Sequence, residues 1–216
     1  MQLIHTIEIT PYSFAEDKYE MPQPGGSKEF PEEWYQYWKN CLAEKKLGCL
    51  EPIQKASHLV NIETINDAEL EEILNHKFRD MESVIEEVYR MDGGIALWEN
   101  DQLYIEPQCC GDIGDLSRWE EIAQSAENQW HQIWIGHPFI YYRRNNGHID
   151  FSDYVEPGEE VKEYEVLVTV SQTELQAELI KMRKLHNDFE HRIRKTLDKM
   201  GIAESEEISK ILTGND

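Results

Sequence analysis

Thiols and carboxylates stand together in one short stretch of this sequence. Cys109 and Cys110 are adjacent, and the run Gly-Asp-Ile-Gly-Asp from 111 to 115 follows at once. Thiolates bind soft metal ions or act as nucleophiles, and carboxylates hold hard cations or transfer protons. The stretch could therefore form a site, although small and acidic residues are also what a sharp structural turn requires.

Zinc binding is the first chemistry that this stretch allows. His131 and His137 lie downstream of the two cysteines and could complete a set of ligands. Adjacent residues on an extended chain point to opposite faces, so both thiolates could reach one ion only where the chain bends sharply. The usual Cys-x2-Cys spacing is absent, and free cysteine is among the most buried residue types. We therefore expect Cys109 and Cys110 to be buried among apolar side chains, and we predict no metal or cofactor.

A nucleophilic cysteine is the second possibility. Cys110 stands near the start of a predicted helix, whose dipole would stabilise a thiolate. The nearby aspartates would have the opposite effect and raise the pKa of the thiol. A nucleophile also needs a base, and three dispersed histidines do not form a constellation. The candidate bases are His131, His137 and His148.

A carboxylate site is the third possibility. Asp112 and Asp115, together with Glu106, could hold a divalent cation or form an acid/base pair. Their spacing matches no calcium-binding loop, because Asp-Ile-Gly-Asp lacks the later acidic ligand. Capping of the helix that follows explains both aspartates more simply. We therefore expect Asp112 and Asp115 to act as helix caps.

Common catalytic signatures are absent from the sequence. It contains no Gly-x-x-x-x-Gly-Lys-Ser, Gly-x-Gly-x-x-Gly, His-Glu-x-x-His or Gly-x-Ser-x-Gly motif. This absence favours a protein that is not an enzyme, and we assign no catalytic residue. The alternative is a hydrolase or metal-dependent enzyme that uses the Cys109–Asp115 turn together with a histidine.

Acidic residues greatly outnumber basic ones. The 216 residues include 43 Asp and Glu against 21 Lys and Arg, a formal net charge of −22 at pH 7. A nucleic-acid binder needs a positive surface, and anionic membranes repel an acidic protein, so neither partner is expected. The charge fits either a plain solvated surface or a face that binds a basic protein. Basic residues gather in 181–199, which either neutralises the acidic body or docks an acidic partner or a second copy in a homodimer.

The cysteines and the apolar runs indicate a cytoplasmic protein. No apolar run approaches the ~20 residues of a membrane span, and the first residues are too polar for a signal peptide. The cysteine spacing is not of the secreted type, which favours reduced thiols. The four cysteines are Cys41, Cys49, Cys109 and Cys110.

Hydrophobic periodicity and turn residues predict a mixed set of elements. Strands are predicted at 2–10, 58–65, 95–99, 103–106, 130–135, 138–142, 148–151 and 164–170. Helices are predicted from Pro31 to about Gly48, after the cap Asn66-Asp67, at 79–91 and over 116–123. The Pro- and Gly-containing segment 11–30 is predicted to be a loop.

The C-terminal part carries the clearest element. Ser171-Gln172-Thr173-Glu174 is a capping box, an apolar stripe follows for about seven turns, and Gly201 is the expected stop. We predict one α+β domain over 1–216, with a mostly antiparallel sheet and helices on one face. Its parts are an N-terminal strand and loop (1–30), the long helix (171–201) and a tail with a short helix (202–216).

The stretch Gly93–Trp119, with Trp134–Pro138 and Ile149–Tyr154, resembles uncharacterised small bacterial proteins. Their core reads as a strand, Pro-x-Cys-Cys-Gly-Asp, a tryptophan helix and a strand pair. Similar acidic α+β proteins occur among immunity proteins of bacterial toxin systems. The resemblance covers about residues 90–200 and implies a cytoplasmic protein that binds a cognate toxin without catalysis. The leading hypothesis is thus an acidic, immunity-type protein that neutralises a basic partner by direct binding.

Overall fold

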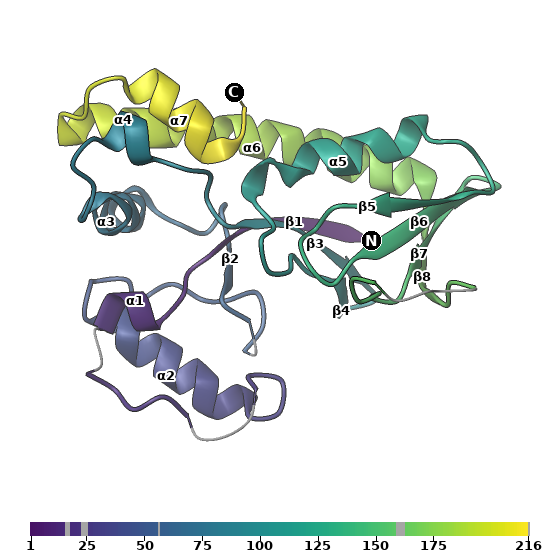
Figure 1. Cartoon of the computed structure of the whole chain (residues 1–216), viewed down its shortest axis with the longest axis horizontal. Helices are drawn as coiled ribbons and strands as arrows, with labels where there is room; N and C mark the ends of the chain where they lie inside the picture. Colours follow the sequence, from purple (N-terminus) through teal and green to yellow (C-terminus); the bar gives the residue numbers. More distant parts are fainter. Residues whose placement is uncertain (16–17, 23–25, 56, 159–162, 216) are drawn as a thin grey trace. The chain divides into compact units, whose positions relative to one another are not determined.

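The computed structural model describes residues 1–15, 18–22, 26–55, 57–158 and 163–215. Its architecture is α+β, as predicted, with two four-stranded antiparallel sheets and a long C-terminal helix (Figure 1). The chain forms two compact units. Unit 1 comprises Met1–Thr6, Arg90–Asp188 and Thr213–Asp216, and unit 2 comprises Ile7–Tyr89 and Phe189–Leu212. That the whole chain folds as one domain stays a prediction.

The larger sheet of unit 1 has the strand order β5-β6-β7-β8, with each strand antiparallel to its neighbour. The predicted hairpin at Asn146-Gly147 is confirmed: both residues have positive φ, 49° and 79°, as a two-residue type I′ turn requires. The strands are β5 (Trp130–Ile133), β6 (Ile140–Asn145), β7 (His148–Ser152) and β8 (Val166–Ser171).

The second sheet has the strand order β2-β1-β3-β4. Its strands are β1 (Gln2–Glu8), β2 (Leu59–Asn61), β3 (Gly93–Glu99) and β4 (Gln102–Ile105). The predicted hairpin between β3 and β4 is confirmed, and it turns at Asn100-Asp101, where both residues have positive φ. Asn and Asp tolerate this conformation, which is why the pair can replace the more usual Asn-Gly.

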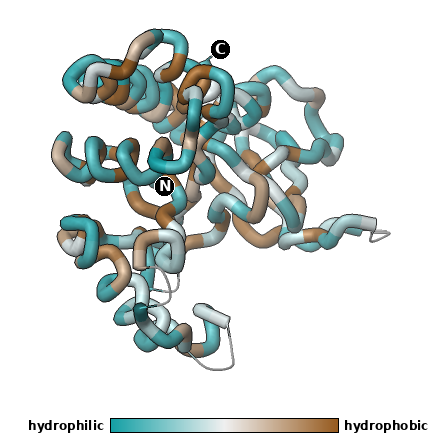
Figure 2. Tube along the Cα trace, turned by 60° about the vertical axis from the view of Figure 1, so that its left-hand side comes forward, coloured by the Kyte–Doolittle hydropathy of each residue, from teal (hydrophilic) through white to brown (hydrophobic). Residues whose placement is uncertain are grey.

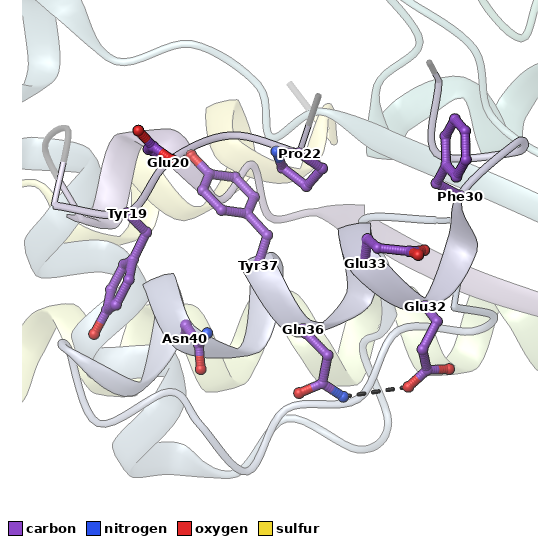
Figure 3. A pocket seen from close by; sticks show the side chains of 9 residues that line it. All are labelled: Tyr19, Glu20, Pro22, Phe30, Glu32, Glu33, Gln36, Tyr37 and Asn40. Atoms are coloured by element: carbon purple, nitrogen blue, oxygen red, sulfur yellow. Dashed lines mark hydrogen bonds between the residues drawn. The ribbon is translucent and has the colours of Figure 1, made fainter. Parts of the chain in front are cut away.

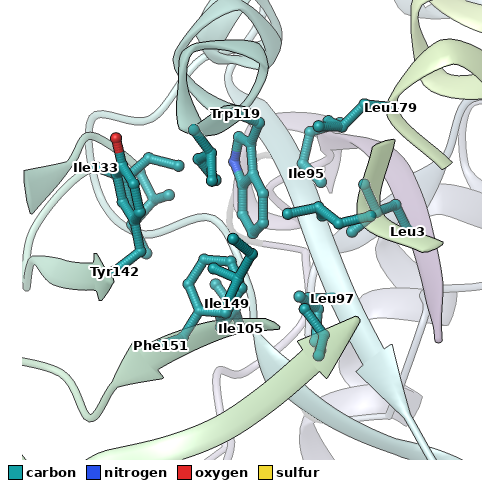
Figure 4. Close-up of a cluster of buried hydrophobic side chains, with 14 of the residues drawn as sticks. Leu3, Ile95, Leu97, Ile105, Trp119, Ile133, Tyr142, Ile149, Phe151 and Leu179 are labelled. Carbon is teal, nitrogen blue, oxygen red and sulfur yellow. The ribbon is translucent and has the colours of Figure 1, made fainter. Parts of the chain in front are cut away.

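The core of unit 1 lies between the β5–β8 sheet and helices on one of its faces, and it also includes Leu3, Ile95, Leu97 and Ile105 of the second sheet. Two of these helices are α5 (Leu116–Glu121) and the first part of α6 (Gln172–Met200), which run along the same side of the sheet in Figure 1. Trp119 of α5 is fully buried, and its ring lies 5.5 Å from that of Phe151 (Figure 4). Short 3-10 turns, Ile113–Asp115 and Ile122–Gln124, flank α5.

Helix α6 follows the predicted pattern closely. Its buried residues, mostly apolar and including His186, recur every three or four positions, and hydrophilic and hydrophobic residues alternate along the C-terminal helices in Figure 2. Gly201 ends the helix at φ 74°. Its N–H donates to Asp198 O, and the N–H of Ile202 donates to Leu197 O, which together form a Schellman motif. The short tail helix is α7 (Ser205–Thr213).

Unit 2 is built around α2 (Pro31–Ala43) and α3 (Asp67–Phe78). Helix α2 begins with Pro31, as predicted, and its buried Trp38 donates from Nε1 to Ile9 O at 2.7 Å. Helix α3 begins at the predicted cap, where Asn66 and Glu69 form a reciprocal capping box. No helix in the described part of the chain is long and apolar enough to cross a membrane.

Two predictions of secondary structure in unit 2 are wrong. A short helix, α1 (Tyr12–Ala15), forms in the predicted loop because Phe14 and Ala15 are buried there. The helix predicted over 79–91 shrinks to one turn, α4 (Val84–Glu87), in which no residue is buried. A short helix without a packed face has too little to stabilise it, so the apolar spacing alone does not extend it.

Candidate functional site

The stretch with the adjacent cysteines forms a β-turn. The N–H of Gly111 donates to Gln108 O at 2.9 Å, which closes the four-residue turn Gln108–Gly111. Cys110 has φ 71°, whereas Cys109 keeps a negative φ. Positive φ at the third position alone is the signature of a type II turn, in which glycine or asparagine is usual and a cysteine is strained.

Both thiols of this turn are exposed, so the prediction that they are buried is wrong. The two sulfur atoms lie 3.5 Å apart. On an extended chain they would point to opposite faces, but the left-handed conformation of Cys110 brings both to the same side. Of the other cysteines, Cys41 is buried and Cys49 is exposed.

The turn is held in place by backbone groups of residues 135–137. Gln108 N donates to Ile135 O at 2.7 Å, and His137 N donates to Cys109 O at 2.9 Å. Gly136 makes this approach possible, because a Cβ there would lie 2.4 Å from the carbonyl oxygens of Gln108 and Cys109. These hydrogen bonds satisfy polar groups of the turn backbone, while both thiols face solvent.

The three candidate histidines lie in different surroundings. The ring of His137 packs against Trp134 and Phe139, with centroids 5.0 and 4.7 Å away. His131 lies against Tyr142, and His148 interacts through Nδ1 with Asn146 O at 3.2 Å. Of these three histidines, only His137 contacts the cysteine turn, and it does so through its backbone N–H. Within the described ranges, no group of three or more His, Cys, Asp or Glu side chains could hold a metal ion.

Asp112 and Asp115 form a capping box on the short 3-10 turn before α5, whereas the predicted side-chain cap on α5 itself is not made: Asp115 stands at its N-cap position without such a hydrogen bond. Asp112 Oδ1 accepts from Gly114 N at 2.7 Å, and Asp115 Oδ2 accepts from Asp112 N at 2.9 Å. Burial raises the pKa of Asp115 to about 6, and the charge of Asp112 adds to this, against the hydrogen bond from Asp112 N. The backbone N–H of Glu106, the third carboxylate candidate, donates to the hydroxyl of Tyr154 at 3.0 Å.

A pocket that the sequence reasoning missed lies in unit 2, on one side of α2. Tyr37 points from the helix toward the segment that carries Glu20 and Pro22 (Figure 3). The clue in the sequence was an aromatic loop placed before a helix that opens with two glutamates. This α2 pocket has a volume of about 620 Å3 and is lined by Tyr19, Glu20, Pro22, Phe30, Glu32, Glu33, Gln36, Tyr37 and Asn40.

The electrostatics of the α2 pocket are acidic, since its lining includes three glutamates and no basic side chain. Glu32 is engaged: Lys55 Nζ lies 2.5 Å from its Oε2, and Gln36 donates to its Oε1 at 3.3 Å. The hydrogen bond from Lys55, followed by that from Gln36, lowers the pKa of Glu32. Glu20 and Glu33 are exposed and make no ion pair within the described residues.

Unit 2 already pairs cations with carboxylates and aromatic rings. Lys55, besides its contact with Glu32, places Nζ 5.5 Å from the ring centre of Tyr35. Lys77 lies closer to an aromatic face, 3.6 Å from the ring centre of Tyr89. Both arrangements show that an aromatic face of this unit attracts a cation, and at Lys55 a carboxylate adds to that attraction.

The face of the β5–β8 sheet away from the core carries a polar and aromatic ladder. Trp130, Arg143, Asp150 and Thr169 are cross-strand neighbours on four successive strands. The guanidinium of Arg143 stacks 4.7 Å from the Trp130 ring and donates from Nη2 to Asp150 Oδ2 at 2.8 Å. Trp, Tyr and Arg are residue types that dominate binding energy at protein interfaces, so this face is a second candidate contact surface.

Comparisons with protein-family models, with curated proteins and with solved structures find no match to this chain.

Proposed function

We propose that this chain is a non-catalytic binding protein that neutralises a basic protein partner, in the manner of a bacterial immunity protein. The α2 pocket carries the proposal, because it combines aromatic rings with carboxylates and has no basic side chain in its lining. Two of those carboxylates, Glu20 and Glu33, are not engaged by any cation of the described chain. An arginine or lysine from a partner would supply the missing charge.

Arginine suits the pocket better than lysine. Its planar guanidinium stacks on aromatic faces, donates two parallel hydrogen bonds to one carboxylate and is more weakly hydrated than an ammonium. A volume of about 620 Å3 is ample for such a side chain. Arginine is also among the residues that most often anchor protein interfaces.

The charge of the whole chain supports the same partner. Unit 1 has 20 acidic against 8 basic residues and unit 2 has 23 against 13, so the acidic excess belongs to both units. Opposite charge steers a basic protein toward such a surface and raises the rate of association. We place this function in the cytoplasm, where the four cysteines stay reduced.

The test uses short peptides that contain arginine and matched peptides in which citrulline, its neutral analogue, replaces it. We expect the wild-type protein to bind only the arginine peptides, and binding to weaken as salt rises. Glu20→Gln/Glu33→Gln should lower the affinity by about tenfold, or 1.4 kcal/mol. The matched control is Glu63→Gln/Glu86→Gln, which removes the same charge at exposed positions elsewhere in unit 2.

Equal loss of binding in both double variants would refute the pocket as the binding site. Equal binding of arginine and citrulline peptides would refute recognition of a cation. The immunity role has a separate test: the protein product of the adjacent gene is expressed with and without this chain. Rescue of growth and formation of a complex are expected, and an acidic or harmless neighbour that does not bind would contradict this role.

A hydrolase that uses the Cys109–Asp115 turn is the second candidate, and the exposure of the Cys110 thiol is the observation in its favour. Cys110→Ser would abolish such an activity against ester or amide substrates. An unchanged variant would exclude the nucleophile.

A further inference from the structure

We propose that Cys109 and Cys110 form a reactive vicinal dithiol, a site that exchanges with small-molecule disulfides and closes reversibly into a disulfide between adjacent residues. This inference concerns unit 1 and is independent of the pocket in unit 2.

Three features of the turn bring the thiols into a reactive arrangement. Both side chains are exposed, so a small disulfide can reach either sulfur. The sulfur atoms are 3.5 Å apart, which leaves only a short movement to bond formation. Cys110 holds a left-handed conformation that places both side chains on the same side of the chain.

The turn is also prevented from relaxing to an extended chain, in which the sulfurs would separate. Hydrogen bonds fix it on both flanks: Gln108 N to Ile135 O, His137 N to Cys109 O, and Gly93 N to Gly111 O. A Cβ on Gly111 would lie 2.8 Å from Ile135 O, so the backbones are in close contact. The dithiol is therefore preorganised by the fold.

The chemistry proceeds in two exchange steps. The thiolate of one cysteine attacks a sulfur of the small disulfide RS–SR, the S–S bond breaks, and RS⁻ leaves and takes up the released proton. The second thiolate then attacks the cysteine sulfur of this mixed disulfide and expels the second RS⁻, which is protonated in turn. The protein loses two protons and two electrons, and RS–SR is reduced to two RSH.

The closed form should reopen easily. Adjacent Cα atoms are about 3.8 Å apart, whereas disulfides normally join Cα atoms about 4.4 to 6.8 Å apart. Strained and exposed disulfides are the labile ones, and in the cytoplasm such bonds serve as transient or sensing groups. Exchange at this turn would therefore respond to the balance between thiols and disulfides around the protein.

The experiment treats the folded, full-length protein with oxidised glutathione, quenches with acid, alkylates the remaining thiols and maps the peptides by mass. We expect the wild-type peptide that contains Cys109 and Cys110 to lose two hydrogens and both alkylation sites. The exposed Cys49, which has no adjacent cysteine, should stop at the mixed disulfide and serves as the internal control.

Single variants complete the test. Cys109→Ser and Cys110→Ser should each accumulate glutathione on the remaining thiol, and excess dithiothreitol should restore both thiols of the oxidised wild type. Circular dichroism checks that the variants are folded, as expected for exposed positions. A stable mixed disulfide at Cys109 or Cys110 in the wild type, or a disulfide mapped to Cys49 in place of the adjacent pair, would overturn the proposal.

Discussion

The imidazole rings of His5 and His186 stack in the interior of unit 1, with 5.0 Å between their centroids and 12° between their planes. His5 Nε2 lies 3.1 Å from Ile113 O and donates to it. Burial is the main reason that the pKa of His5 falls to about 3, and repulsion from His186 adds to it. The fold thus requires His5 to be neutral.

His5 should make the protein sensitive to acid. Between pH 6.5 and about 3 the unfolded chain binds a proton at this residue and the folded chain does not, so stability falls as pH drops through this range. His5→Gln keeps a donor for Ile113 O but has no group that titrates. Between pH 7 and pH 3, we expect its free energy of unfolding to fall by about 4 kcal/mol less than that of the wild type. Urea unfolding at both pH values measures this, with exposed His148→Gln as the control. Parallel losses in all three proteins would contradict it.

Asp115 should change the stability of the protein with pH in the direction opposite to His5. Its folded pKa of about 6 lies above the ordinary 3.8, so between these values the folded state holds a proton that the unfolded state has lost. Stability therefore falls as pH rises from about 3.8 to 6. When pH goes from 4 to 7, the free energy of unfolding of Asp115→Asn should rise by about 2 to 3 kcal/mol relative to that of the wild type.

Denaturant unfolding at pH 4 and pH 7 provides the measurement for Asp115. Asp101→Asn, at an exposed position of the β3–β4 hairpin, is the control. If Asp115→Asn showed the same change with pH as this control, burial of the carboxyl group would not be the cause.

Gly136→Ala should be strongly destabilising. The new Cβ would collide with the carbonyl oxygens of Gln108 and Cys109, in a residue whose φ of 97° already disfavours a side chain. We expect a loss of about 2 to 4 kcal/mol. Gly201→Ala isolates the second effect, since that residue has φ 74° and open space around its Cβ, and should cost about 1 kcal/mol. Equal unfolding midpoints for both variants would show that the turn can move away.

The ion pair of Asp150 should contribute more to the stability of the fold than an exposed ion pair does. Burial alone would raise the pKa of Asp150, but hydrogen bonds from Arg143, Thr169 and Asn145 outweigh it and lower that pKa. Asp150→Ala leaves three donors without their acceptor, and we expect a loss of about 2 kcal/mol. Glu121→Ala, which removes the acceptor of an exposed pair with Arg118, should cost less than about 1 kcal/mol.

Thermal and urea unfolding of both variants tests this ranking. Equal destabilisation by the two substitutions would mean that water replaces the partners of Asp150 as readily as those of Glu121. The stability that Asp150 provides should also disappear as pH falls through its lowered pKa.

Local patterns in the sequence predicted much of the fold. The stripe and stop of α6, the Asn146-Gly147 hairpin and the Asp112 cap each depend on residues a few positions apart, so their signals are contained in short segments. The antiparallel, α+β architecture follows from the order of such elements. The segment 79–91 shows the limit: its apolar spacing is helical, but only the turn Val84–Glu87 forms, and none of its residues is buried.

The candidate sites were harder to predict because they depend on distant residues. Exposure of Cys109 and Cys110 follows from the φ of Cys110 and from hydrogen bonds to residues 135–137, which no local pattern reveals. The α2 pocket joins a loop around Tyr19 to a helix that begins at Pro31. Composition indicated the sign of the charge, but only the fold shows which carboxylates remain available to a cation.

Neither unit is a continuous piece of the chain, and this has a consequence for biosynthesis. Phe189–Leu212 complete unit 2, and unit 1 includes residues from Thr213 onward. The segment Ile7–Tyr89 is synthesised before all of Arg90–Asp188, whereas Phe189–Leu212 are synthesised only after it. The core of unit 2 therefore stays incomplete while unit 1 is synthesised, and during that time its exposed apolar residues need protection from aggregation.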